Sequence, residues 1–93
     1  MSTQRAADGS LTVFSPELKL KSGDSVQLDW CREWATNCGK PAADAYCASK
    51  GLGPSSNEVA KPNYGLTVVI SDQRICNGRD CTSFQQLTCG PRP

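Results

Sequence analysis

The sequence contains no histidine, and this absence removes the commonest general base and metal ligand. Without histidine, no Ser-His-Asp or Cys-His arrangement for nucleophilic catalysis can form. Aromatic residues are scarce, at 6% of the 93 residues. No stretch approaches the roughly 18 consecutive apolar residues of a membrane-spanning helix, and no lipidation signal is present. We therefore expect a protein that is not an enzyme and has no membrane partner.

Net charge is also nearly absent, because ten Lys and Arg face nine Asp and Glu and leave a formal charge of +1. The basic residues are scattered along the chain, whereas nucleic-acid-binding proteins concentrate them on one face. We therefore expect no nucleic-acid partner. No Asn-x-Ser/Thr sequon occurs, which excludes N-linked glycosylation of this sequence.

What the chain does contain is cysteine, six residues in all. A domain of this size buries only about 60–65% of the surface that its unfolded chain exposes, so its thin core needs covalent support. The cysteines lie beside turn residues and spread over two thirds of the chain, which predicts three disulfides and an extracellular, oxidising location. They are Cys31, Cys38, Cys47, Cys76, Cys81 and Cys89.

The six cysteines could serve two other purposes. They could be buried, reduced core residues of a cytosolic protein, or they could be ligands of a structural zinc site. Zinc sites favour closely paired cysteines or cysteine with histidine, and only Cys76 and Cys81 come near that spacing. We therefore expect no metal and no cofactor. Residues 1–10 lack the charged and apolar regions of a signal peptide, so we interpret the chain as the mature form of an exported protein.

Hydrophobic periodicity predicts one short helix at about residues 41–50. Pro41 suits the first turn, the alanines that follow are strong helix formers, and Gly51 is a natural left-handed cap. Asp44 is placed in the first turn and Lys50 in the last, where both favour the helix dipole.

Alternating residues predict strands at 25–31 and 64–71, and a proline-interrupted edge strand at 11–20. The Asn-Gly turn near residue 77 predicts a closing hairpin, and the Gly-, Pro- and Ser-rich stretch 51–63 predicts a long loop. The predicted fold class is α+β, with a small, mostly antiparallel sheet of about four or five strands and one helix.

We expect one disulfide-bonded domain over residues 11–90, a disordered segment over 1–10 and a tail over 91–93. Six cysteines allow 15 pairings. Cys76–Cys81 is favoured because the two residues flank a four-residue turn. Cys38–Cys47 is disfavoured, because the predicted helix separates the two residues by roughly 10 Å. Cys47–Cys89 would tie the helix to the sheet.

A sugar ring stacks its apolar face on an exposed aromatic side chain, and nearby polar groups then bind its hydroxyls. A small domain also needs large side chains in its core, so we expect Trp30 inside and Trp34 as the stacking platform. The candidate ligand-binding residues are Trp34, Asp29, Arg32, Glu33, Asn37, Tyr64 and Arg79.

Two other interpretations stay open. Residues 76–81 hold Asn-Gly-Arg between two cysteines, which would present Arg79 to a protein partner, although Asn-Gly can equally serve the turn and Arg79 solubility. Asp29 and Glu33 flank Trp30 and could form a carboxylate pair of the glycosidase kind, although both can equally be solvated surface acids.

Two motifs carry a resemblance to known proteins. They are W-A-x-N-C-G-x-P-A-A-D-A-Y-C, ending at Cys47, and C-x4-C-x2-F-x4-C, ending at Cys89. They resemble an uncharacterised group of small cysteine-rich domains of secreted or surface proteins, over roughly residues 26–89. The resemblance implies the cysteine framework and an extracellular location, and it transfers no activity.

The sequence thus predicts a secreted, monomeric, non-enzymatic binding module, with a cell-wall or other carbohydrate as its ligand. The alternative is a small secreted defence or effector protein, of the inhibitor or toxin kind, that acts on an extracellular protein. A small carboxylate-dependent hydrolase is the third hypothesis.

Overall fold

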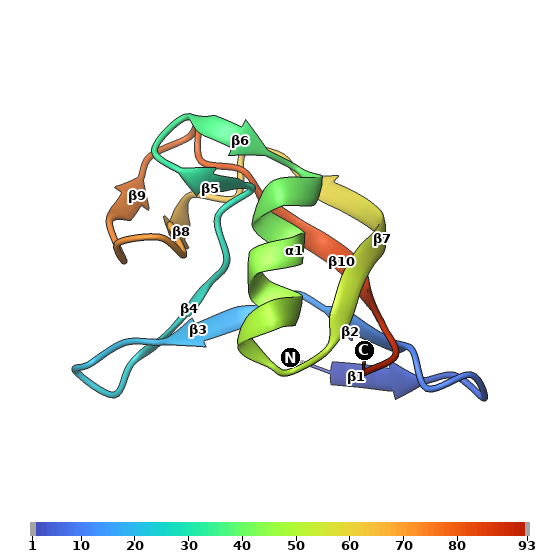
Figure 1. Ribbon diagram of the computed structural model, residues 1–93. Coiled ribbons are helices and arrows are strands. Elements are labelled where there is room, and N and C mark those ends of the chain that lie inside the picture. Colours follow the sequence, from blue (N-terminus) through green and yellow to red (C-terminus); the bar gives the residue numbers. More distant parts are fainter. Residues whose placement is uncertain (1, 93) are drawn as a thin grey trace.

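The computed structural model describes residues 2–92 and shows one helix beside a set of short sheets (Figure 1). Helix α1 (Lys40–Ser49) packs on a four-stranded antiparallel sheet of order β1-β2-β10-β7. The strands of this sheet are β1 (Ser2–Arg5), β2 (Leu11–Phe14), β7 (Gly53–Lys61) and β10 (Ser83–Gly90). The predicted α+β class is confirmed.

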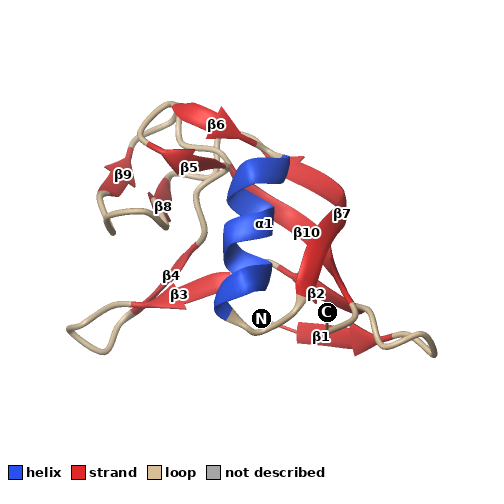
Figure 2. Cartoon of the chain, viewed as in Figure 1, coloured by secondary structure: helices blue, strands red, loops and turns tan. Residues whose placement is uncertain are grey.

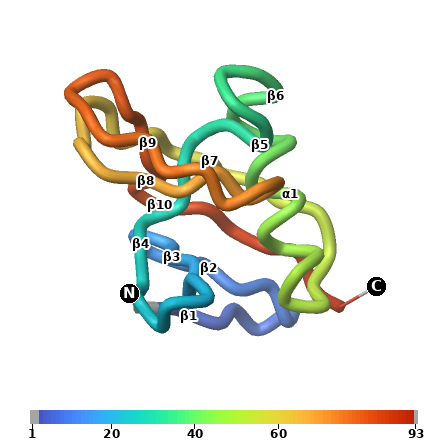
Figure 3. Tube along the Cα trace, turned by 90° about the vertical axis from the view of Figure 1, so that its left-hand side faces the viewer, coloured from blue at the N-terminus to red at the C-terminus, as the bar shows by residue number. Residues whose placement is uncertain are grey.

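The remaining strands form three antiparallel hairpins. They are β3 (Glu17–Lys19) with β4 (Ser25–Gln27), β5 (Cys31–Glu33) with β6 (Thr36–Cys38), and β8 (Leu66–Val68) with β9 (Ile75–Asn77). Figure 2 separates the single helix from these strands by colour. Turned by 90°, the molecule shows β5–β6 and β8–β9 at one end and β1–β2 at the other (Figure 3).

The prediction of disorder over residues 1–10 is wrong for residues 2–5, which form β1. This strand pairs antiparallel with β2, and Arg5 lies opposite Leu11. A tight turn joins the two strands, where the Ser10 N–H donates to Asp8 Oδ1 at 2.9 Å and Gly9 has a φ of 93°. The side chains of residues 3–5 are exposed and form no apolar pattern; antiparallel backbone pairing to the edge of β2 holds the strand in place. Met1 lies outside the described residues.

The predicted loop at 51–63 is also wrong, because residues 53–61 form β7. The alternation of buried and exposed residues is present, but its buried members are small: Gly53 and Ser55 rather than large apolar residues. Register shifts against β10 accommodate this irregular sequence. Gly53 is required by close packing, since a Cβ there would lie 2.6 Å from the carbonyl oxygen of Pro91.

The helix lies close to its predicted place. It begins one residue earlier than expected, at Lys40, and Gly39 is its N-cap with a φ of 79°. Gly51 follows the C-terminus with a φ of 73°, which is the left-handed conformation that glycine accepts most readily. Lys50 is the C-cap residue rather than part of the last turn.

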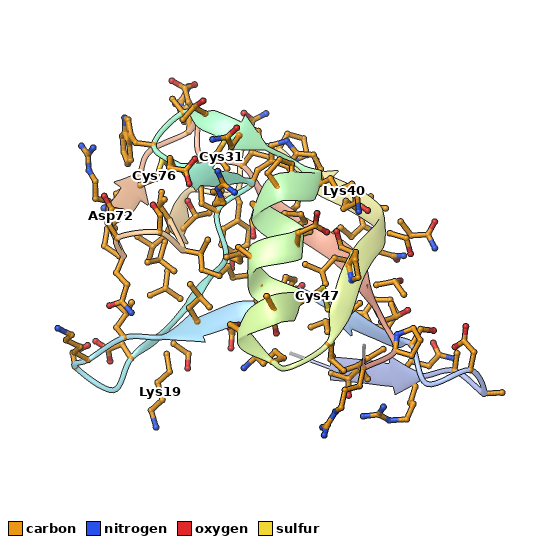
Figure 4. All side chains as sticks on the ribbon, in the orientation of Figure 1. Lys19, Cys31, Lys40, Cys47, Asp72 and Cys76 are labelled. Carbon is orange, nitrogen blue, oxygen red and sulfur yellow. A yellow bond between two sulfur atoms is a disulfide. The ribbon has the colours of Figure 1, made fainter. Side chains whose placement is uncertain are left out.

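Asp44 does not lie in the first turn, so the expected interaction with the helix dipole is wrong. It joins α1 to β7 instead, because its Oδ1 accepts from the Ser55 N–H at 2.8 Å and from the Ser55 hydroxyl at 2.7 Å. The Lys40 ammonium donates to the same atom and to the Ser55 carbonyl oxygen, and Figure 4 shows Lys40 beside β7. Partial burial raises the pKa of Asp44, but the hydrogen bonds from Ser55 and Lys40 outweigh it and hold the pKa below its ordinary value.

The core lies between α1 and the sheet and is centred on a disulfide. Its buried members are Val13, Leu28, Ala42, Ala43, Tyr46, Cys47, Phe84, Leu87 and Cys89. Cys47 bonds to Cys89, which ties the helix to β10; the sequence left this pairing open. Cys76–Cys81 is confirmed, and Cys31–Cys38 closes the β5–β6 hairpin. Within the described chain no helix is both long and apolar enough to cross a membrane.

The three disulfides should differ in their contribution to stability. Their sequence separations are 42 for Cys47–Cys89, 7 for Cys31–Cys38 and 5 for Cys76–Cys81. Loop-closure entropy then predicts that paired Cys→Ala variants lose about 4, about 2.5 and about 2 kcal/mol of unfolding free energy, respectively. Urea unfolding of the three variants measures this order. An equal or smaller loss for the Cys47–Cys89 pair would contradict the central role of that crosslink.

Candidate functional site

A cavity of about 210 Å³ lies at the end of the molecule that carries the hairpins β5–β6 and β8–β9. Cys31 stands on the β5 wall and Cys76 on the β9 wall (Figure 4). Its lining combines aromatic rings, disulfide sulfurs and a few oxygen atoms. The lining residues are Asp29, Trp30, Cys31, Trp34, Ala35, Cys76, Asp80, Cys81 and Thr82.

Trp30 forms part of the core and part of the cavity wall at once. Its ring packs on Phe84 with the ring centres 4.6 Å apart, and a Cβ on Gly39 would lie only 3.2 Å from the indole. The glycine at the helix N-cap therefore leaves the room that Trp30 occupies. The expected position of Trp30 in the core is correct only in part, because the side chain is half-buried and also faces the cavity.

Trp34 is the exposed aromatic residue of this cavity, with 44% of its surface accessible. It sits in the β5–β6 turn, where the next residue, Ala35, has a φ of 58°. The guanidinium of Arg74 lies 4.2 Å from the indole centre and covers one face of the ring. Because Trp34 also lines the cavity, ring surface that Arg74 does not cover is available to a bound molecule.

Asp29 supplies a fixed carboxylate inside the cavity. It is only 7% exposed, and its carboxylate accepts from the Thr67 hydroxyl at 2.5 Å and from the Cys31 N–H at 2.9 Å. Its own N–H donates to the Val68 carbonyl oxygen at 2.9 Å, so the backbone is held as well. A carboxylate offers about four acceptor positions, and these two donors leave capacity for a ligand hydroxyl.

Three of the predicted site residues form a separate cluster on the outside of the β5–β6 hairpin. Arg32 Nε donates to Glu33 Oε2 at 2.5 Å, and the Asn37 amide donates to Glu33 Oε1. The hydrogen bonds from Arg32 and then Asn37 hold the pKa of Glu33 below its ordinary value. None of the three lines the cavity, so the structure does not join them to Asp29 and Trp34.

Tyr64 and Arg79 lie near the cavity without lining it. The Tyr64 N–H donates to the Cys81 carbonyl oxygen at 2.8 Å, but its ring lies beneath the Lys61 ammonium, 5.1 Å from the ring centre. Arg79 is exposed on the disulfide-bonded loop, and its neighbour Asp80 lines the cavity in its place.

Asp80 and Thr82 flank Cys81 and complete the polar lining, and neither is among the site residues predicted from the sequence. The signal that could have found them is the Cys76–Cys81 bridge, because it fixes the short loop that contains Asp80 and that Thr82 follows. The bridge alone does not identify them as site residues, because nothing in the sequence shows that this loop lies near Trp34.

Comparison with protein-family models, curated proteins and solved structures finds no match. The described residues contain no cluster of three or more His, Cys, Asp or Glu side chains that could hold a metal ion. The lining of the cavity combines aromatic side chains with carboxyl and hydroxyl groups.

The hydrogen bond between Thr67 and Asp29 should be more important for stability than an ordinary hydroxyl contact. Thr67 is fully buried and donates to a carboxylate, and a buried charge that loses a donor pays its desolvation cost. We expect Thr67→Val to lower the unfolding free energy by about 2 kcal/mol in urea denaturation.

Thr88→Val is the matched control, because the Thr88 hydroxyl pairs with the neutral Thr12 hydroxyl at 2.9 Å in a partly buried site. It should cost less than about 1 kcal/mol. Equal losses for the two variants would show that Asp29 does not depend on Thr67.

Proposed function

We propose that the protein is a secreted, non-enzymatic carbohydrate-binding module whose 210 Å³ cavity holds one sugar ring of a larger glycan. The observation that carries the proposal is the convergence of two tryptophans and two carboxylates on one cavity: Trp30, Trp34, Asp29 and Asp80. A cavity of about 150 Å³ holds benzene, so this one has room for a six-membered ring with its hydroxyls.

The apolar and the polar groups of the lining would contact different parts of a sugar. The apolar face of a sugar would pack against the indole rings, while hydroxyls on its edge donate to the carboxylates of Asp29 and Asp80. The Thr82 side chain would add a further hydrogen-bonding group. Because Cys31–Cys38 and Cys76–Cys81 brace opposite walls, little conformational entropy is lost when a ligand binds.

The charge of the lining favours uncharged sugars. Asp29 and Asp80 are acidic, and no lysine or arginine is among the lining residues. A uronic acid or sulfated sugar would meet repulsion there, whereas neutral hexoses or amino sugars would not.

Export is supported by the covalent framework. All six cysteines are paired, and no free cysteine occurs in the described chain. Such disulfide density is typical of small extracellular domains, because the cytosol keeps thiols reduced.

A hydrolase that uses Asp29 and Glu33 has less support. Only Asp29 lines the cavity, while Glu33 is bound to Arg32 and Asn37 on the outer surface of the hairpin. The two carboxylates do not flank a common ligand position, as a glycosidase pair must.

Trp34→Ala should reduce glycan binding at least tenfold, because it removes the accessible stacking surface. A glycan array of neutral polysaccharides identifies the ligand, and titration calorimetry then measures the affinity of each variant. Tyr64→Ala is the matched control, since Tyr64 is 41% exposed against 44% for Trp34 but does not line the cavity. If no glycan is retained, or if both variants bind equally well, the proposal is wrong.

A protein partner is the second candidate, and the distribution of exposed apolar side chains favours it. Trp34, Val59, Tyr64, Leu66 and Ile75 are the exposed large hydrophobic residues of the described chain. All but Val59 lie in or beside the hairpins β5–β6 and β8–β9. Exposed apolar residues at one end of a small protein are typical of an interaction surface. Arg79 is displayed at the same end.

Leu66→Ser combined with Ile75→Ser separates the two candidates, because neither residue lines the cavity. If the partner is an extracellular protein, we expect the double variant and Arg79→Ala to lose binding in a cell-surface protein array. Glycan binding should be unchanged in both. Loss of glycan binding in the double variant, with the fold intact by circular dichroism, would instead place the glycan on β8–β9.

A further inference from the structure

A second cavity, of about 260 Å³, lies where β1 and β2 meet the C-terminal end of α1. This is the end of the molecule away from the two hairpins that form the first cavity (Figure 1). Its floor is apolar and consists of Leu11, Val13 and Leu52 with the Tyr46 ring. Val13 is 2% exposed and Leu11 and Leu52 pack on the core, so the floor is fixed in place by the fold.

The rim of this second cavity is cationic. Arg5 comes from β1, Lys50 caps α1, and Arg92 comes from the C-terminal segment. No aspartate or glutamate lines the cavity. The ion pairs among residues 2–92 are Arg32–Glu33 and Lys40–Asp44, and neither pair includes one of the three rim cations.

The contacts of Arg5 and Lys50 are with uncharged groups. Arg5 Nη1 donates to the Gly9 carbonyl oxygen at a long 3.4 Å, and the Lys50 ammonium lies 5.5 Å from the Tyr46 ring centre. Burial, with a smaller contribution from the charge of Glu17, raises the pKa of Tyr46. The side chains of Arg5, Lys50 and Arg92 therefore place three like charges around one apolar cavity.

We propose that this second cavity binds a small amphiphilic carboxylate, with its aliphatic body on the apolar floor and its carboxylate among Arg5, Lys50 and Arg92. Arginine guanidiniums pair with carboxylates through two parallel hydrogen bonds, which suits Arg5 and Arg92. Since about 150 Å³ holds benzene, 260 Å³ has room for an aliphatic body of roughly eight to ten carbons. The occupant is a free monocarboxylate rather than a membrane lipid, whose chains exceed this volume.

Titration with octanoate, followed by two-dimensional ¹H–¹⁵N NMR, tests the proposal. We expect saturable shifts of the Leu11, Val13 and Leu52 amides. Octanol is the uncharged probe with the same chain length, and it should bind at least tenfold more weakly, because it lacks the carboxylate. Octanoate should also raise the melting temperature, since it binds the folded state only.

Arg5→Gln combined with Arg92→Gln should weaken octanoate binding at least tenfold. Lys19→Gln combined with Lys21→Gln is the matched control, because these exposed cations lie on the β3–β4 hairpin and do not line the cavity. Lys50→Gln alone should weaken binding several-fold, and it tests the rim without altering β1. Trp34→Ala should leave octanoate binding unchanged, so failure of the glycan proposal and failure of this one are distinguishable.

Four results would each overturn the proposal. They are the absence of saturable shifts with octanoate, equal binding of octanol, equal weakening in the Lys19/Lys21 control, and binding to vesicles of anionic phospholipid without any response to free octanoate.

Discussion

The bond between Cys47 and Cys89 is the constraint on which the rest of the structure depends. It joins the one helix to β10, the strand that lies between β2 and β7, and both sulfurs are fully buried. A core this small offsets the entropy of ordering the chain only narrowly. The crosslink lowers the conformational entropy of the unfolded chain, and it closes the longest of the three loops. In the folded state it holds Tyr46 and the alanines of α1 against Phe84 and Leu87.

The other two disulfides act on the surface rather than on the core. Cys31–Cys38 and Cys76–Cys81 each close a short segment, and Cys31, Cys76 and Cys81 line the first cavity. A hairpin of three-residue strands has little stability of its own. The bridges therefore allow Trp34 and Asp80 to be held in place at the surface, where a packed core cannot fix them. Asp29 connects the surface cavity to the protein interior, because it lines the cavity and accepts a hydrogen bond from the buried Thr67 hydroxyl.

Local sequence signals predicted the features that depend on local chemistry. Pro41 and Gly51 marked the helix, and the turn between Cys76 and Cys81 marked a bridge. The strands β1 and β7 were not predicted. Strand β1 is held by backbone pairing to its neighbour, and β7 buries small residues: Gly53 against the backbone of residues 90–91 and Ser55 against Asp44 of α1. For the site, Trp34 and Asp29 were recognised by residue type, whereas Asp80 depends on a long-range approach of two hairpins that no local pattern encodes.

The net charge of this chain does not describe its surfaces, because the fold places acidic residues around one cavity and basic residues around the other. The formal charge of +1 conceals two carboxylates in the cavity at one end and three cations around the cavity at the other. Arg5, Lys50 and Arg92 are scattered in the sequence and meet only because β1 joins the sheet beside the end of α1 and the C-terminal segment. Strand β1, which no apolar pattern predicts, therefore brings Arg5 to Lys50 and Arg92, and the residues that line the two cavities differ in the sign of their charge.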